Sequence, residues 1–380
     1  MTRLASGARQ LTGAALLAAL LAAGGCAAPE PGAAPDPTAA SGESSGADAA
    51  SRLEAAQRLL ASRAGENLLA SIDDFERLLA DPELTEVQRA VAAAGLAEAS
   101  ALVGLYSLLP PAETMPRAEQ AAAQALELAP EDARTHAVQG LVRYLWSWDF
   151  DGAAVSFERA ISLDPGLSTA HLWWAMMLSA EGRHDEALQR VEEGRAASGY
   201  ASRLLETKTV TLLVAADRLE QARVQVAAVL EAHPEVALGH RELGLLELAA
   251  AEGTQVEADP EARRRHLEAA RDAFVRAGEL SGGDARSTAG LAHAAGKLGE
   301  RERAEAAIAE LDQRATREFV PPLYQALARL GLDDRSAALD LVEQALEIRD
   351  PGLVYLRTRP GLRSLDGDPR FERVAAAVGI

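Results

Sequence analysis

The pattern of apolar and polar positions predicts helices along nearly the whole chain after about residue 51. The stretch "GAAVSFERAISLDP" shows the unit, with Ala153, Phe157 and Ala160 at helical spacing on one face and Pro165 just beyond. Such spacing is typical of an amphipathic helix, and a proline disfavours its continuation. Small residues allow the helix to lie close to a preceding helix around Gly140, while the phenylalanine fills the space beside the crossing. We therefore predict a pair of antiparallel helices here.

This small–large–small pattern recurs along the chain. Pro130 and Pro165, which end equivalent helices, lie 35 residues apart. A fixed period in this range indicates a repeat array, in which each helix pair buries its apolar face against the next pair. The sequence predicts an all-α solenoid of about seven to eight helix–turn–helix units over residues 51–380. The other sets begin at Ser71, Ala118, Ala187, Ala222, Ala270, Ala304 and Ala338.

The repeats resemble those of the tetratricopeptide repeat (TPR) family over roughly residues 65–380, most closely over 116–200. The resemblance implies a superhelical stack whose inner surface, formed by the first helix of each unit, binds protein segments. The C-terminal part resembles TPR arrays that are appended to bacterial cyclases, kinases and winged-helix regulators. The chain ends in a stretch that predicts a C-terminal capping helix, with Asp368 as N-cap and Pro369 at the first helical position.

The N-terminus is typical of an exported protein. Two arginines, Arg3 and Arg9, precede a short apolar run over 11–23, and small residues then lead to Cys26. This stretch resembles a secretory signal that ends in a bacterial lipobox, although Ala23 occupies the place where that family usually has leucine. The resemblance implies that 1–25 is a lipoprotein signal peptide and that Cys26 is lipidated. The alternatives are a plain secreted protein and an uncleaved anchor.

The segment that follows is rich in Ala, Pro, Gly and Ser, and its composition cannot supply a folded core. We predict that residues 26–50 comprise the lipidated cysteine and a disordered tether, and that 51–380 form the solenoid. The implied location is the cell envelope, with the protein lipid-anchored, on the outer membrane facing the periplasm if the cell is Gram-negative.

Composition and charge narrow the function. Only 4% of residues are aromatic against 48% hydrophobic, which suits closely packed helices rich in alanine and leucine. The net charge of −19 argues against nucleic acid as a partner, because nucleic-acid binding needs a basic surface. Cys26 is the single cysteine, so no intramolecular disulfide can form.

No motif predicts catalysis, a metal site or a cofactor. "GESSG" at 42–46 matches a nucleophile elbow but lacks the strand that such an elbow needs. "GLAHAAGKL" at 290–298 departs from the phosphate-binding loop in spacing and in its last residue. Three histidines each follow a proline by six residues, and we interpret them as packing residues with one ring nitrogen satisfied. These are His136, His171 and His240.

Four tryptophans fall within two adjacent repeats: Trp146, Trp148, Trp173 and Trp174. They predict either core packing or an aromatic patch on the inner surface. Alignment with the TPR family implies a partner groove near Arg134, Trp173, Met176, Arg203 and Arg241. Aromatic and arginine side chains are enriched in such binding sites.

The sequence thus predicts a non-catalytic, lipid-anchored envelope scaffold that binds protein or peptide segments. The alternative is a sensory or accessory receptor module that holds a small ligand or glycan in the solenoid groove. A deep, closed pocket beside the tryptophans would favour the small ligand, and an open groove would favour the peptide.

Overall fold

The computed structural model describes residues 39–63, 65–198, 203–253 and 259–380. The chain divides into two compact units, 1–43 and 44–380. Of the first unit only the beginning of one helix is described, so the expected signal peptide and Cys26 lie outside the described residues.

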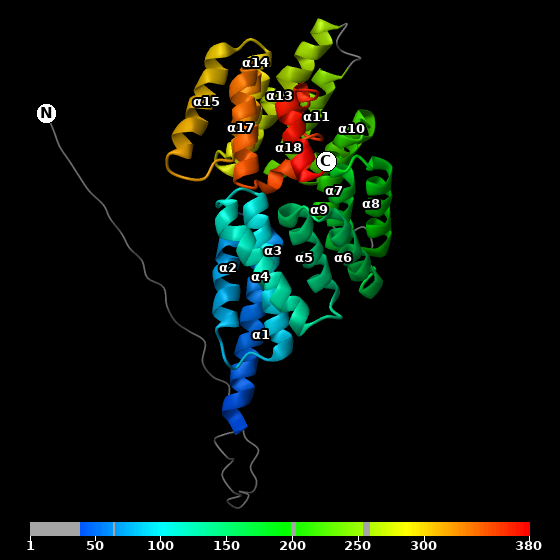
Figure 1. Ribbon diagram of the computed structural model, residues 1–380, viewed down its shortest axis with the longest axis vertical. Coiled ribbons are helices and arrows are strands. Elements are labelled where there is room, and N and C mark those ends of the chain that lie inside the picture. Colours follow the sequence, from blue (N-terminus) through cyan, green and yellow to red (C-terminus); the bar gives the residue numbers. More distant parts are fainter. Residues whose placement is uncertain (1–38, 64, 199–202, 254–258) are drawn as a thin grey trace, which may run out of the picture. The chain divides into compact units, whose positions relative to one another are not determined.

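Helix pairs follow one another along the second unit (Figure 1). The first helices of the pairs are α3 (Glu86–Leu105), α5 (Ala133–Val142), α7 (Ser168–Ala180), α9 (Arg203–Ala215), α11 (Ala237–Glu252), α14 (Ala285–Lys297) and α16 (Pro322–Gly331). Their partners are α4 (Pro111–Leu128), α6 (Phe150–Leu163), α8 (His184–Ser198), α10 (Leu219–Ala232), α13 (Pro260–Ser281), α15 (Arg301–Ala315) and α17 (Arg335–Glu347). Before them lie α1 (Ala39–Ser62) and α2 (Gly65–Leu79), and the chain ends in α18 (Pro369–Val378). No strand occurs in the part of the chain that the structure describes, so the predicted all-α solenoid is confirmed.

The start of α1 differs from the expected boundary. The sequence placed a disordered tether up to residue 50, whereas α1 begins at Ala39 and Ala49 is already buried. The prolines of the tether end at Pro37, and the following residues include many alanines, the residue with the highest helix propensity. The prediction treated 26–50 as one segment by its average composition, and so it missed the change to alanine-rich sequence after Pro37.

Close packing of small residues against phenylalanine occurs where the sequence pattern placed it. A Cβ added to Gly140 would lie 2.6 Å from the ring of Phe157. Additions at Gly244 and Gly290 would lie 2.7 and 2.6 Å from the ring of Phe274. Both phenylalanines are buried. Each ring therefore occupies the space that a missing side chain on a first helix leaves open.

The three histidines have the local role that their spacing predicted. In each case Nε2 lies within hydrogen-bond distance of the carbonyl oxygen of the proline six residues earlier. The distances are 2.8 Å for His136 and Pro130, 3.0 Å for His171 and Pro165, and 2.8 Å for His240 and Pro234. Each bond joins a first helix to the turn before it, and the predicted satisfaction of one ring nitrogen is confirmed.

The C-terminal segment returns to the earlier repeats. It contains two short 3₁₀ helices, η2 (Pro351–Tyr355) and η3 (Leu362–Leu365), and η2 packs against the π-helical end of α5, η1 (Arg143–Ser147). Arg349 Nη2 donates to the carbonyl oxygen of Trp146 at 2.7 Å, and the hydroxyls of Tyr144 and Tyr355 are hydrogen-bonded. The array therefore curves until residues more than 200 positions apart are in contact.

The chain end is capped as predicted. The Asp368 side chain accepts a hydrogen bond from the backbone N–H of Arg370, and Pro369 occupies the first position of α18. Phe371 and Val374 on this helix are buried, so one face of α18 covers the last repeat.

Candidate functional site

A partly enclosed cavity of about 140 Å³ lies along the first helices of the repeats. Side chains from α3, α5, α7, α9, α11, α14 and α16 line it. Phe274 of α13, Arg63 between α1 and α2, and residues 355 and 358–360 of the C-terminal segment complete the wall. Because residues of the C-terminal segment form part of its wall, this region is a partly enclosed cavity.

Much of the cavity wall is apolar. Its larger apolar side chains include those of Leu172, Trp173, Met176, Phe274 and Leu327. Trp173 and Phe274 are only 5% and 2% exposed, so they belong to the packed core as well as to the wall. A side chain in both places is held in one position by its neighbours, which makes this part of the wall preformed.

Five cationic side chains reach the same cavity, and three of them pair with carboxylates. Arg63 Nη2 lies 2.5 Å from Glu98 Oε1, Lys208 Nζ 2.8 Å from Glu242 Oε1, and Arg241 Nη1 3.1 Å from Asp284 Oδ1. Both glutamates are buried. The charges of these three cations are therefore compensated within the protein, because an opposite charge replaces the water that a buried ion loses.

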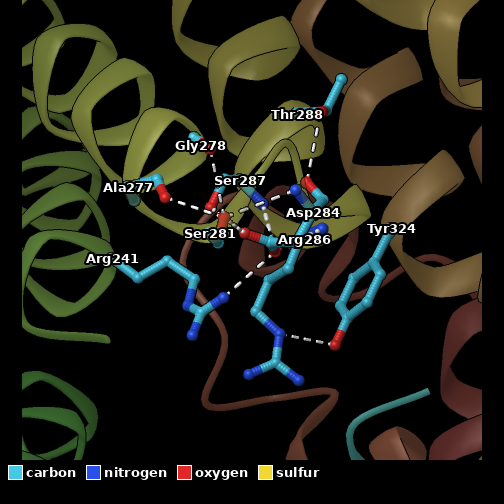
Figure 2. A network of polar contacts seen from close by, with 9 residues as sticks. All are labelled: Arg241, Ala277, Gly278, Ser281, Asp284, Arg286, Ser287, Thr288 and Tyr324. Carbon is cyan, nitrogen blue, oxygen red and sulfur yellow. Dashed lines mark hydrogen bonds and ion pairs between the residues drawn. The ribbon is translucent and has the colours of Figure 1, made fainter. Parts of the chain in front are cut away.

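The other two cations, Arg286 and Arg359, form no ion pair with any carboxylate of the described residues. Instead, both lie near the ring of Tyr324, with Cζ 5.4 and 5.3 Å from its centroid. Arg286 Nε also donates to the Tyr324 hydroxyl at 2.7 Å (Figure 2). An aromatic ring attracts a cation but does not neutralise it.

The start of α14 positions Arg241 and Arg286. Asp284 caps this helix by accepting from the backbone N–H of Ser287 at 3.0 Å, and its carboxylate also binds Ser281 Oγ and Arg241 (Figure 2). Burial opposes ionisation of Asp284, but Arg241 and these hydrogen bonds outweigh it and hold its pKa well below the usual range. In Figure 2 the guanidinium groups of Arg241 and Arg286 lie on the same side of this helix end.

The pKa values of the cavity tyrosines depend on the balance between burial and the nearby arginines. Burial by itself would raise the pKa of Tyr324, but Arg286 and Arg359 outweigh burial and lower it. The same two arginines also act on Tyr355, but there burial outweighs them and raises the pKa to about 12. Burial likewise raises the pKa of Asp350, whose interactions with Arg359 and Arg286 do not overcome it.

Three of the arginines that line the cavity each leave a buried guanidinium nitrogen without a hydrogen-bond partner among the described residues. The atoms are Arg63 Nη1, Arg241 Nε and Arg359 Nη1. Buried polar atoms without partners are few in folded proteins, and each one raises the free energy of the folded state. They gather here around one cavity, although the residues come from distant parts of the chain.

The predicted groove residues separate into two groups. Trp173, Met176 and Arg241 line the cavity, whereas Arg134 and Arg203 are exposed at the starts of α5 and α9 and do not. Sequence reasoning missed Arg63, Arg286 and Arg359. Arg286 is the second residue of its helix, as Arg134 is, so repeat position could have indicated it. No repeat signal marks the other two.

The four tryptophans do not form one patch. Trp146 and Trp148 both stack with Arg349, whose Cζ lies 5.2 and 4.3 Å from their rings, and Trp174 stacks with Arg190 at 4.2 Å. Only Trp173 among them lines the cavity. Trp148 has a left-handed backbone (φ 55°) where the π-helical turn ends, which is strained for a bulky residue.

Within residues 39–63, 65–198, 203–253 and 259–380, no group of three or more His, Cys, Asp or Glu side chains lies close enough together to hold a metal ion. Among the described helices, none combines the length and the apolarity needed to cross a bilayer.

Comparison with solved structures identifies the class of fold. The human IFIT1 dimer with m7Gppp-AAAA is similar with a TM-score of 0.53 and 16% sequence identity, over 82% of this chain and 73% of that one. A chain of the APC/C hetero-tetramer Cut9–Hcn1 is similar with a TM-score of 0.50 and 16% identity, over 84% of this chain and 54% of that one. Both are TPR-type helical-repeat proteins. No protein-family model and no curated protein matches the sequence.

The chain therefore has a TPR-type helical-repeat fold, as its sequence pattern predicted. At these identities the likeness establishes the fold.

Proposed function

We propose that this protein is a non-catalytic binding module that holds a small ligand in the cavity on the inner side of its solenoid. The observation that supports this most directly is the cavity itself, which first helices surround and the C-terminal segment partly closes. A groove for an extended peptide needs open ends along the repeats, whereas here residues of the C-terminal segment form part of the cavity wall. The receptor module, the alternative from the sequence, thus becomes the leading function.

The chemistry of the cavity supports binding and not catalysis. Its cations are chiefly arginines, which stay protonated near neutral pH and hold anions in place but do not transfer protons readily. The lysine, Lys208, is already paired with Glu242. The proposed role therefore needs no cofactor and no metal.

A protein scaffold remains the second candidate. Arg134 and Arg203 are exposed at the starts of α5 and α9, where a protein segment could reach them without entering the cavity. One similar structure, the Cut9–Hcn1 hetero-tetramer, is itself an assembly of two kinds of chain. We do not propose nucleic acid as the ligand, because the net charge is −19 and the cations gather around a cavity of only about 140 Å³.

Filling the cavity tests the proposed function. Met176 is half-buried and lines the cavity, so Met176→Trp is expected to occupy the space that a ligand needs. A library of neutral and charged fragments, followed by ligand-observed NMR, is expected to give bound fragments with the wild type and none of these with the variant. The matched control is Val224→Trp, because Val224 is 74% exposed on α10. Absence of any fragment binding, or equal binding by Met176→Trp, would show that the cavity is not a ligand site.

We further propose that the module is anchored to the cell envelope through lipidated Cys26, facing the periplasm from the outer membrane if the cell is Gram-negative. The support is the signal-like N-terminus that ends at the single cysteine. Two acyl chains or more give stable anchoring, and bacterial lipoprotein signals lead to such modification. The tether would then separate the folded repeats from the membrane.

Labelling with palmitate tests the anchor. In cells that express the full chain, the wild type is expected to incorporate labelled palmitate and to sediment with membranes. Cys26→Ser is expected to lose both the label and the sedimentation, because the thiol is the acylation site. A second variant, Ser41→Cys in the Cys26→Ser background, controls for acylation of any nearby thiol. Equal label in the wild type and Cys26→Ser would rule out this anchor.

A further inference from the structure

The charges around the cavity do not balance. Arg286 and Arg359 are the two lining cations without a carboxylate partner in an ion pair among the described residues, and both are half-buried. Asp284 acts on Arg286 electrostatically, but its carboxylate is already paired with Arg241 at 3.1 Å. The other carboxylate that interacts with both arginines, Asp350, is buried with one oxygen bound by the backbone N–H of Gly352 and the other unpartnered. Burial raises the pKa of Asp350, which favours its neutral form. Asp350 is therefore a poor source of compensating charge.

A cation that is partly buried without a paired counter-ion destabilises a folded protein, because it loses part of its hydration and gains nothing of equal strength. The stacking of both guanidinium groups on Tyr324 offsets this only in part. The unpartnered nitrogens Arg359 Nη1, Arg241 Nε and Arg63 Nη1 add further donors that lack acceptors in the described residues. An anion in the cavity would supply both the missing charge and an acceptor.

The rest of the wall decides which kind of anion fits. Leu172, Trp173 and Met176 present carbon to the cavity, so a phosphate would leave some of its oxygens facing apolar atoms. A carboxylate needs fewer donors and matches the fork of a guanidinium group. The volume of about 140 Å³ resembles that of apolar protein cavities that accept one benzene ring.

We propose that the cavity holds a small apolar carboxylate, with its anionic group neutralising Arg286 and Arg359 and its apolar body, of about one ring in size, against the wall that contains Trp173 and Met176. This proposal rests on the proposed function, because it names the chemical class of the ligand for the same cavity. It accounts for the two unpaired arginines as binding residues and not as parts of the structural framework.

Removal of an uncompensated charge gives a test that needs no ligand. Arg359→Met keeps a long side chain near Tyr324 but removes the charge. The ligand-free variant is expected to melt at the temperature of the wild type or above it, because binding residues are often held at a cost in stability. Arg301→Met, at a position that is 73% exposed on α15, is the matched control and is expected to leave melting nearly unchanged. A clear fall in melting temperature for Arg359→Met alone would show that Arg359 is structural.

Calorimetric titration with phenylacetate tests the ligand class. Phenylacetate is expected to bind the wild type at least about tenfold more tightly than phenylacetamide, which has nearly the same shape without the charge. Arg359→Met and a second variant, Arg286→Met, are expected to lose this preference, and Arg301→Met to keep it. Equal binding of phenylacetate and phenylacetamide would overturn the proposal of a carboxylate ligand. The cavity would still be a ligand site.

Other probes distinguish the remaining sources of negative charge. Inorganic phosphate and inorganic triphosphate are expected to bind more weakly than phenylacetate, and tighter binding of either would overturn the choice of carboxylate. The dipeptide acetyl-Ala-Phe with a free carboxylate is also expected to bind more weakly, because the cavity has room for about one ring. Tighter binding of this peptide would overturn the proposal and indicate that the cavity binds the C-termini of polypeptides. If phenylacetate fails while neutral fragments bind, only this inference falls, whereas failure of every fragment removes the proposed function as well.

Discussion

Trp173→Ala is expected to lower the free energy of unfolding by about 3–5 kcal/mol, the range for removing a large buried aromatic side chain. Trp173 is 5% exposed and packs within the main hydrophobic core as well as against the cavity. Truncation would leave a hole next to the existing cavity, and the surrounding helices cannot close both. The measurement is chemical denaturation of the wild type and the variant without ligand.

The adjacent residue provides the control for this substitution. Trp174 is half-buried and stacks with Arg190, whose Cζ lies 4.2 Å from the ring centroid. Trp174→Ala is expected to cost less than half as much, because it loses one cation–π contact and part of a buried surface. The sequence allowed Trp173 to be either a core or a groove residue. If Trp173→Ala unfolds at the same denaturant concentration as the wild type while partner capture falls, the core assignment is wrong.

Gly331→Ala is expected to lower the free energy of unfolding by about 2–3 kcal/mol, because it overpacks a contact between two backbones. A Cβ on Gly331 would lie 2.7 Å from the carbonyl oxygen of Ala292 and 2.7 Å from Cα of His293. From the other side, a Cβ on Gly296 would lie 2.3 Å from the carbonyl oxygen of Gly331. Backbone atoms cannot turn aside as a side chain can, so α14 and α16 would have to separate.

Gly278→Ala is the matched control for this prediction. Gly278 lies within α13, and an added Cβ would meet only Ser287 Cβ, at 3.9 Å. The same change is therefore expected to raise the free energy of unfolding by about 0.5–1 kcal/mol, since alanine has the higher helix propensity. Thermal and denaturant unfolding of both variants gives the comparison. Equal effects of the two substitutions would contradict the close crossing of α14 and α16.

The sequence determined the repeating local structure of this protein. Gly140 with Phe157, and Gly244 with Phe274, are contacts within one helix pair, so their spacing along the chain carries the information. The bond of His171 to the carbonyl of Pro165 spans six residues and is local for the same reason. Patterns of this kind can be found from one sequence, because each repeat contacts mainly its neighbours.

The groove was only partly accessible from the sequence. Alignment with the TPR family identifies which face of a first helix turns inward. Trp173, Met176 and Arg241, which were predicted on that basis, do line the cavity. Arg134 and Arg203 lie at the very start of α5 and α9 and are exposed, whereas Arg241 is the fifth residue of α11. Repeat position fixes the face of the helix on which a residue lies. It does not fix how far the array curves over that residue.

The tertiary structure alone decided that the inner side becomes a partly enclosed cavity with excess positive charge. Arg63 and Arg359 come from opposite ends of the described chain, and the C-terminal segment meets η1 through contacts such as that of Arg349 with Trp146. Curvature is the sum of small rotations between successive repeats, and no single repeat pattern encodes that sum. The local pattern thus determined the helix pairs and their close contacts, whereas the accumulated rotation brought distant arginines to one place.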